Sequence, residues 1–297
     1  MEPVYSYSLL TLSTVMFGVT FFFKDIFRKH YGSDLQATLV TSIGGGIFGL
    51  LALLIIKGFV LEFSWFALIM ALISSVNSLL FSFCSLKALG KINLSLYSLF
   101  SMLGGMTLPF LSGICFHGEA LTIGKLACFA VIAVALFLTA EKEKAWGDTK
   151  YYVGIFVFNG MSGVIAKIYQ ALPFERISSA GYSILTALVS IALAGCLILT
   201  IKTEKRKIDL PCLFALAGSG ILNRLANWIL LIALVSLPAS AQYPFVTGGT
   251  MIISTAISLL TAKKPCKREI AAVILSFIGI LLLTLMPQIS IFSINWR

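Results

Sequence analysis

The sequence has little charge. Only 11% of its 297 residues are charged, whereas about a quarter is usual for a soluble domain. Acidic residues are the scarcer kind, with 12 Asp and Glu against 22 Lys and Arg, and 59% of the chain is hydrophobic. Too little polar surface remains to cover such a core in water. This excludes a water-soluble enzyme, a soluble nucleic-acid-binding domain and a disordered chain, and it predicts a chain immersed in lipid.

Catalytic and metal-binding patterns are also missing. The six cysteines include no CxxC pair, and the two histidines, His30 and His117, fall in predicted loops with no partner nearby in the sequence. Neither a Ser/His/Asp, an HExxH nor a phosphate-loop pattern occurs. We therefore expect no catalytic residue, no metal and no cofactor. The formal charge of +10 does not indicate a nucleic-acid partner, because the basic residues lie between apolar stretches, where they meet anionic lipid headgroups.

Apolar stretches of membrane length fill most of the chain. Since about 20 residues span a bilayer as a helix, and lipid leaves no other way to satisfy the backbone of such segments, we predict an all-α integral membrane protein with ten transmembrane helices. The expected spans are Tyr5–Phe27, Leu35–Ile56, Trp65–Leu86, Ile92–Ile114, Leu121–Leu138, Tyr152–Tyr169, Ile177–Ile201, Leu210–Leu234, Ser240–Leu260 and Ile270–Met286.

The spacing of these stretches indicates a duplication. The second five begin about 145 residues after the first five. Because each half has an odd number of spans, the second half must enter the membrane from the opposite side, which makes an inverted repeat around a central cavity. We expect a first repeat at 1–140, a charged linker at 141–150, a second repeat at 151–288 and a tail at 289–297.

Arg224 is the most informative polar residue within a span. It lies near the middle of the eighth stretch, where an arginine costs roughly 2.5 to 3.5 kcal/mol unless something solvates it. Asn223 is adjacent, and Asn227 and Trp228 follow one turn later. A guanidinium beside amides and an indole could hold a carboxylate or phosphate. The alternative is a structural arginine that pairs with helix-end carbonyls or a buried amide.

Other polar residues extend this candidate substrate site. The ninth stretch opens with Gln242, Tyr243 and Pro244 and places Tyr243 and Thr247 on one helical face, and Tyr97 occupies a similar place in the fourth. Asn77 and Asn159 are further candidates for a cavity wall. Lys24 and Lys167 hold equivalent places late in the first and sixth spans, where both can reach an interface. Small residues pack helices together, and we assign the serine stripe to that role: Ser74, Ser78, Ser82 and Ser85.

The pattern resembles a known family. Two halves of five spans, Ala88-Leu89 at the end of the third and Gly118-Glu119-Ala120-Leu121-Thr122 between the fourth and fifth are similar to EamA-type members of the drug/metabolite transporter superfamily. In the second half, Lys263-Lys264-Pro265-Cys266 replaces the latter motif. The resemblance implies a basket of helices with alternating access. It implies that spans 1, 3, 4, 6, 8 and 9 form the cavity wall, that spans 5 and 10 support it, and that both termini are cytoplasmic.

These observations favour a secondary transporter of a small organic solute in the cell membrane, with a bacterial cytoplasmic membrane expected. Because no Asp or Glu lies in mid-span, an anionic, zwitterionic or neutral cargo is favoured over a cation. Arg224 favours an amino acid or another carboxylate-bearing metabolite, and transport of neutral or cationic drugs or metabolites is the alternative. An integral-membrane enzyme acting on lipid-linked substrates and a non-transporting scaffold are alternatives from other classes. The expected partners are the solute and the bilayer, and a monomer is compatible with the sequence. Most basic residues fall in connections after odd-numbered spans, which places the termini outside, opposite to the family expectation.

Overall fold

The computed structural model describes residues 3–32, 34–89, 94–139, 149–260, 267–286 and 290–292, and it is almost entirely helical there. The helices begin within about one turn of the expected apolar stretches. They are α1 (Pro3–Tyr31), α2 (Leu35–Lys57), α3 (Trp65–Leu89), α4 (Leu94–His117), α5 (Ile123–Thr139), α6 (Thr149–Ala171), α7 (Ser179–Thr200), α8 (Leu210–Ser236), α9 (Ala239–Leu260) and α10 (Lys267–Leu285), with two short strands, β1 (Leu121–Thr122) and β2 (Ser290–Phe292).

Seven helices within the described residues are long and apolar enough to cross a membrane: α1 to α4 and α6 to α8. Shorter apolar segments lie in α5 and α10. Large apolar side chains cover the outside of the molecule, including Leu51, Ile55 and Phe137, which are 45%, 67% and 61% exposed. Such a surface is stable against acyl chains and unfavourable in water. The chain is therefore a multi-pass, all-α membrane protein.

Side chains at the connections determine where several helices begin. The Asp34 carboxylate accepts a hydrogen bond from the backbone N–H of Ala37, 2.9 Å away, at the start of α2. Ser178 caps α7 and Asp209 caps α8 in the same way. Each cap satisfies a backbone donor that the first helical turn leaves unpaired.

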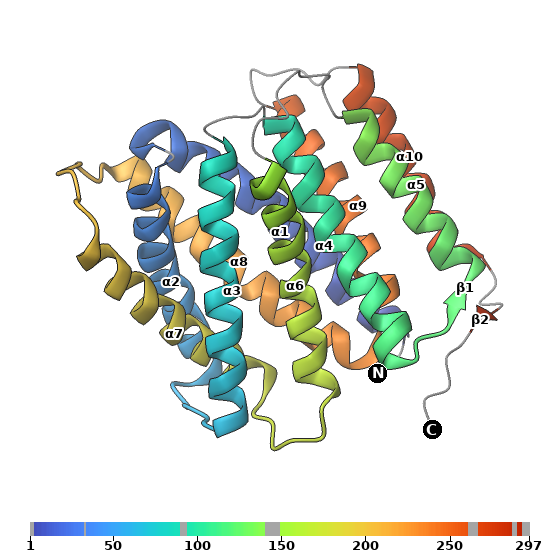
Figure 1. Ribbon diagram of the computed structural model, residues 1–297, viewed down its shortest axis with the longest axis horizontal. Helices are drawn as coiled ribbons and strands as arrows, with labels where there is room; N and C mark the ends of the chain where they lie inside the picture. The colour runs from blue at the N-terminus through green and yellow to red at the C-terminus, as the bar shows by residue number, and fades with distance from the viewer. Residues whose placement is uncertain are drawn as a thin grey trace.

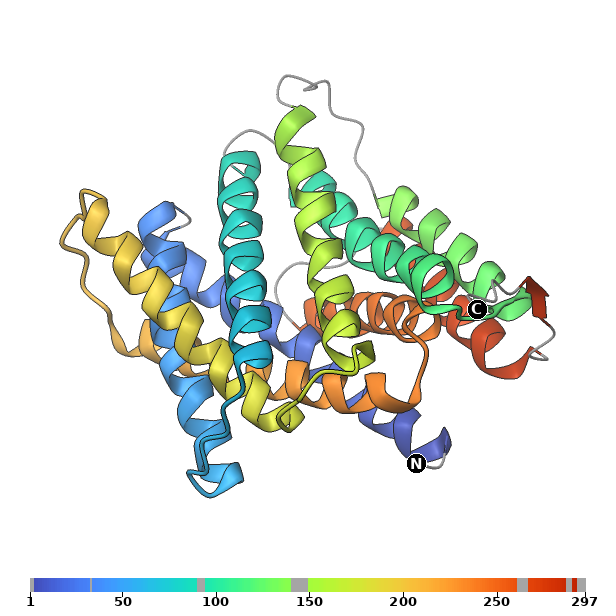
Figure 2. The same ribbon diagram turned by 60° about the horizontal axis from the view of Figure 1, so that its bottom comes forward.

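The helices form pairs that run across the molecule (Figure 1). The pair α2 and α7 lies at one end of the view and the pair α5 and α10 at the other, with the remaining helices between them. In the interior α1 packs against α8 and α9, α6 packs against α3 and α4, and α4 also contacts α9. Figure 2 shows α3 and α6 side by side in the second view. Residues far apart in the sequence therefore form the centre of the bundle.

Close helix contacts depend on glycine. Where α2 crosses α8, a β-carbon at Gly220 would overlap the backbone of Gly45. Where α4 crosses α6, a β-carbon at Gly160 would lie 2.5 Å from the carbonyl oxygen of Gly104. Without side chains at these crossings the two backbones approach closely, as small residues allow in membrane helices.

Two expected boundaries differ from the structure. Leu121 and Thr122 were expected to begin the fifth span, but they form β1, which pairs antiparallel with β2 from the expected tail. The Thr122 hydroxyl accepts a hydrogen bond from the N–H of Lys125, so that α5 begins only after Thr122. Residues 141–148 of the expected linker lie outside the described residues, and α6 begins at Thr149, within that linker.

Candidate solute-binding site

A cavity of about 550 Å³ lies among the helices. Its wall contains residues of α1, α2, α3, α6, α7, α8 and α9. The contribution of α2 and α7 differs from the wall implied by the family resemblance, and no described residue of α4 lines the cavity. No described residue of α5 or α10 lines it either. The volume falls within the range of about 300 to 1,000 Å³ of small-molecule sites.

Among the described residues, three basic side chains line this cavity: Lys24 and Arg28 of α1 and Arg224 of α8. Lys24 and Arg28 are one helical turn apart and thus share a face of α1. None of the described lining residues is an aspartate or a glutamate. The sequence indicated Arg224 as the single permanent cation of the chamber, whereas the structure adds Lys24 and Arg28. A lining with these three cations favours an anion over a cation.

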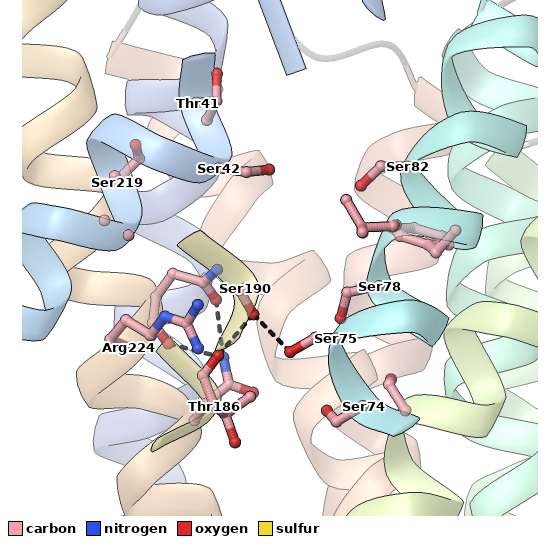
Figure 3. A pocket seen from close by; sticks show the side chains of 18 of the residues that line it. Thr41, Ser42, Ser74, Ser75, Ser78, Ser82, Thr186, Ser190, Ser219 and Arg224 are labelled. Carbon is pink, nitrogen blue, oxygen red and sulfur yellow. Dashed lines mark hydrogen bonds between the residues drawn. The ribbon is translucent and has the colours of Figure 1, made fainter. Parts of the chain in front are cut away.

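Arg224 lies where α2, α7 and α8 meet. Figure 3 shows its side chain extending toward Thr186 and Ser190 of α7, with serines of α3 on the far side of the cavity. Its aliphatic stem packs against Gly49 of α2. Within the described part of the chain the guanidinium makes no hydrogen bond or ion pair, so no helix-end carbonyl or buried amide there supplies the structural partner considered above. Its five donors remain available to a solute or to water.

Hydroxyl groups form the wall opposite Arg224. Ser74, Ser78 and Ser82 of α3 all line the cavity (Figure 3), a position that their assignment to helix packing did not predict. The side chain of Ser85 lies outside the described residues. Nearby, Ser75 Oγ lies 2.9 Å from Ser190 Oγ, which in turn donates to the carbonyl of Thr186. Ser75 must then be the donor in the first of these bonds. Thr41 and Ser42 of α2 and Ser219 of α8 add further hydroxyls.

Three other predicted site residues share this cavity with Arg224: Asn223, Asn227 and Tyr243. The two asparagines do not form a separate cradle, because the Asn227 Nδ2 donates to both the backbone oxygen and Oδ1 of Asn223, at 2.7 and 2.9 Å. They present a joined amide pair beside the guanidinium. Tyr243 lies at the deep end, where its hydroxyl donates to the carbonyl of Gly163, 3.2 Å away.

The remaining predicted site residues lie elsewhere. Asn77 and Asn159 donate to the backbone oxygens of Phe158 and Ser101, and thereby link α3 to α6 and α6 to α4. Gln242 is fully buried and donates to the Leu230 carbonyl. Trp228 and Thr247 are absent from the cavity lining. The side chain of Tyr97 lies outside the described residues.

The cavity is open at one end and closed at the other. Arg28 and Thr38, beside the connection from α1 to α2, mark the open end, and Arg28 is an exposed residue. At the opposite end the lining residues are buried, with Tyr182 4% and Tyr243 8% exposed. Behind them Tyr169 stacks on Tyr182 with ring centroids 3.8 Å apart. These stacked aromatic rings close the cavity at this end.

Beyond these aromatic rings, ion pairs join the connections at the closed end. The Lys57 Nζ lies 2.6 Å from Glu62 Oε1 and donates to the Ser178 hydroxyl at 3.0 Å. Glu62 also accepts a hydrogen bond from the Ser178 N–H at 2.6 Å. The hydrogen bond from Lys57, which outweighs partial burial, lowers the pKa of the Glu62 carboxyl below its ordinary value. These contacts join the α2–α3 connection to the start of α7.

A related cluster stands at the open end. Arg206, after α7, binds Asp34 through two hydrogen bonds of 3.0 and 2.6 Å, and its neighbour Glu204 exchanges backbone hydrogen bonds with the Gln36 amide. Burial by itself would raise the pKa of Asp34, but the hydrogen bonds from Arg206 and from the Ala37 N–H outweigh it and lower that pKa. The α7–α8 connection is thus joined to the start of α2.

Comparisons with known proteins establish the fold only. No family model matches the chain, and no curated protein matches it. One solved structure, described as "Crystal structure of protein", is similar with a TM-score of 0.73 and 15% sequence identity, covering 96% of this chain and 98% of its own. A protein of nearly the same length therefore has the same arrangement of helices.

Proposed function

We propose that this protein is a secondary transporter that carries a small organic anion, most simply an amino acid or another carboxylate-bearing metabolite, across the cell membrane by alternating access. The observation that carries the proposal is the composition of the cavity. Lys24, Arg28 and Arg224 line it, and the described lining contains no carboxylate. Arginine holds a carboxylate through two parallel hydrogen bonds, and the field of three cations disfavours a cationic drug.

The wall facing Arg224 fits the rest of such a solute. Serine and threonine hydroxyls both donate and accept hydrogen bonds, so the serines of α3 can bind amino, hydroxyl or carbonyl groups of the solute. A cavity of about 550 Å³ holds a metabolite of moderate size together with some water. Arg224 would thus bind the charge, and the hydroxyls would bind the remainder.

The helix pairings support an inverted repeat of two five-helix halves. If each helix of the first half is exchanged with its counterpart five positions later, the pairing of α1 with α8 becomes α6 with α3, and α2 with α8 becomes α7 with α3. The pairs α2–α7, α4–α9 and α5–α10 each join a helix to its own counterpart. Five spans in each half would orient the halves oppositely and make ten spans in total.

The two ends of the cavity support alternating access. One end is open beside Arg28, and the other is closed by aromatic side chains and by the Lys57–Glu62 ion pair. An inverted repeat can interchange such ends by rocking one half against the other around a fixed site. By the distribution of basic residues, the open end faces the cytoplasm. The resemblance to EamA-type drug/metabolite transporters also implies alternating access, but its cytoplasmic termini would place the open end on the opposite side.

A thermal-shift panel tests the proposal without knowledge of the cargo. Purified protein is heated in detergent with amino acids, organic acids, sugars, nucleosides and quaternary amines. At least one carboxylate should raise the melting temperature, since ligand at about 100 times its Kd adds roughly 2.7 kcal/mol to the stability of the folded state. Stabilisation by quaternary amines alone would contradict an anionic cargo.

A further inference from the structure

Lys167 lies directly behind the floor of the cavity. Its helix, α6, contributes Gly163 and Ala166 to the lining, and the hydroxyl of Tyr243, another lining residue, donates to the carbonyl of Gly163. On the closed side its Nζ lies 2.9 Å from Oε1 of Glu119. Both side chains are largely buried, with Lys167 14% and Glu119 8% exposed. Lys167 thus follows a lining residue, Ala166, in the sequence, and its charge is paired with the carboxylate of Glu119.

The Glu119 carboxylate is surrounded by hydrogen-bond donors. Gly118 ends α4 with φ of 63°, a left-handed conformation that turns the chain so that Glu119 points back into the molecule. Its carboxylate accepts hydrogen bonds from the N–H groups of Ala239 and Ser240, both at 2.8 Å, and from the Ser240 hydroxyl at 2.6 Å. These donors form the N-terminus of α9, whose dipole favours a negative charge.

The position of the Glu119 carboxylate depends on the absence of a side chain at Gly113 and on the positive charge of Lys167. A β-carbon at Gly113 would lie 2.5 Å from Oε2 of Glu119, so the carboxylate fills the space beside α4. Burial by itself would raise the pKa of Glu119, but the Lys167 ammonium and the hydrogen bonds from Ser240 outweigh it and lower that pKa. The site therefore stabilises a carboxylate in its charged form.

The counterpart of Lys167 meets the cavity directly. Lys24 holds the equivalent place late in α1, and it lines the open cavity. Lys24 and Lys167 therefore lie toward opposite ends of the molecule, Lys24 in the cavity lining and Lys167 against Glu119.

We propose that Lys167, together with the N-terminus of α9, is a second anion-binding site of this transporter, which Glu119 occupies while the cavity is open at the other end and which the solute carboxylate occupies when the closed end opens. This inference rests on the proposed function. In this proposal Lys167 contacts the solute only in the state in which the closed end has opened. Glu119 then acts as a substitute for the solute that keeps the empty site neutral.

Chemical rescue tests whether an external carboxylate can take this place. In Glu119→Ala the side-chain carboxylate is missing, and acetate supplies the same group. Acylation of Lys167 by an amine-reactive reagent is followed by mass spectrometry in the whole protein. Relative to the wild type, Lys167 should react about tenfold faster in Glu119→Ala, since hydrogen bonds to a charged partner are lost. Added acetate should slow this reaction again, and chloride at equal ionic strength should not.

Two further variants serve as controls. Glu62→Ala removes a different carboxylate of the closed end and should speed the reaction of Lys57 while leaving Lys167 slow. If Glu119→Ala fails to give a folded protein, Ser240→Ala weakens the same site while keeping Glu119, and it should raise the reactivity of Lys167 by a few fold. Lys167 reactivity that does not respond to the loss of Glu119, or an acceleration that acetate does not reverse, overturns the proposal.

The outcome is separable from the test of the proposed function, because the labelling needs neither transport nor a known cargo. If acetate protects Lys167 but no carboxylate stabilises or crosses with the intact protein, the anion site stands and the transport function fails. If carboxylates are transported while acetate never protects Lys167, the transport function stands and this second site fails.

Discussion

Gly49 of α2 packs directly against the stem of Arg224 of α8, and a β-carbon at position 49 would overlap Cγ of the arginine and lie 2.6 Å from the carbonyl oxygen of Gly220. The absence of a side chain on α2 therefore determines where the guanidinium of α8 can lie. Gly49, which is absent from the described cavity lining, thus positions a cation that lines it.

Gly49→Ala should displace Arg224 and loosen the crossing of α2 with α8. We expect a loss of about 1 to 3 kcal/mol of stability, typical of overpacking, together with weaker binding of any stabilising carboxylate. Gly195→Ala on α7 is the matched control, because a β-carbon there meets no atom within 4 Å. Its melting temperature should stay the same or rise slightly, since alanine favours a helix over glycine. Equal melting curves for the two variants would count against the positioning role of Gly49.

Ser78→Leu should fill the cavity without unfolding the protein. The added side chain occupies space opposite Arg224, so carboxylate uptake and the carboxylate-induced thermal shift should both disappear. Leu80→Phe on the same helix is the control, because Leu80 is 42% exposed and absent from the cavity lining. The two variants should show similar melting temperatures without ligand. Undiminished uptake by Ser78→Leu would show that the solute follows a different route.

Acid should destabilise the connections at both ends. The pKa values of Asp34, Glu62 and Glu119 lie below their ordinary values of 3.8, 4.5 and 4.5. A carboxyl with a lowered folded-state pKa contributes stability above its unfolded pKa, and this contribution is lost as pH falls through the folded value. The melting temperature should therefore decrease as pH is lowered below about 4.5. Glu62→Gln should reduce the size of this decrease. An unchanged pH profile in that variant would show that Glu62 does not contribute to it.

Much of the helical architecture could be predicted from hydropathy, because lipid requires long apolar helices and permits few alternatives. Arg224 was also predictable, since a permanent charge in the middle of an apolar span requires a polar environment. The serines of α3 were not. A serine suits helix packing and a cavity wall equally, and only the neighbouring helix decides between these roles.

The environment of Glu119 was beyond prediction for a related reason. Its partners Ala239 and Ser240 are 120 and 121 residues away in the sequence. No local pattern indicates that the connection after α4 reaches the start of α9. Lys167 looked like an interfacial lysine by its position, and only the folded chain places it against Glu119. Asn77 and Asn159 were misleading in the opposite direction, because buried amides bind backbone carbonyls of neighbouring helices as readily as a solute.

The most direct test of the account is carboxylate uptake into proteoliposomes by the wild type, by Arg224→Met and by Arg268→Met. Both variants lose one positive charge, but Arg268 is an exposed residue of α10 that is absent from the cavity lining. We predict that Arg224→Met lowers kcat/KM by about 10- to 100-fold, as expected for the loss of a charged hydrogen bond, and that Arg268→Met transports like the wild type. Wild-type uptake of every carboxylate by Arg224→Met would contradict the account.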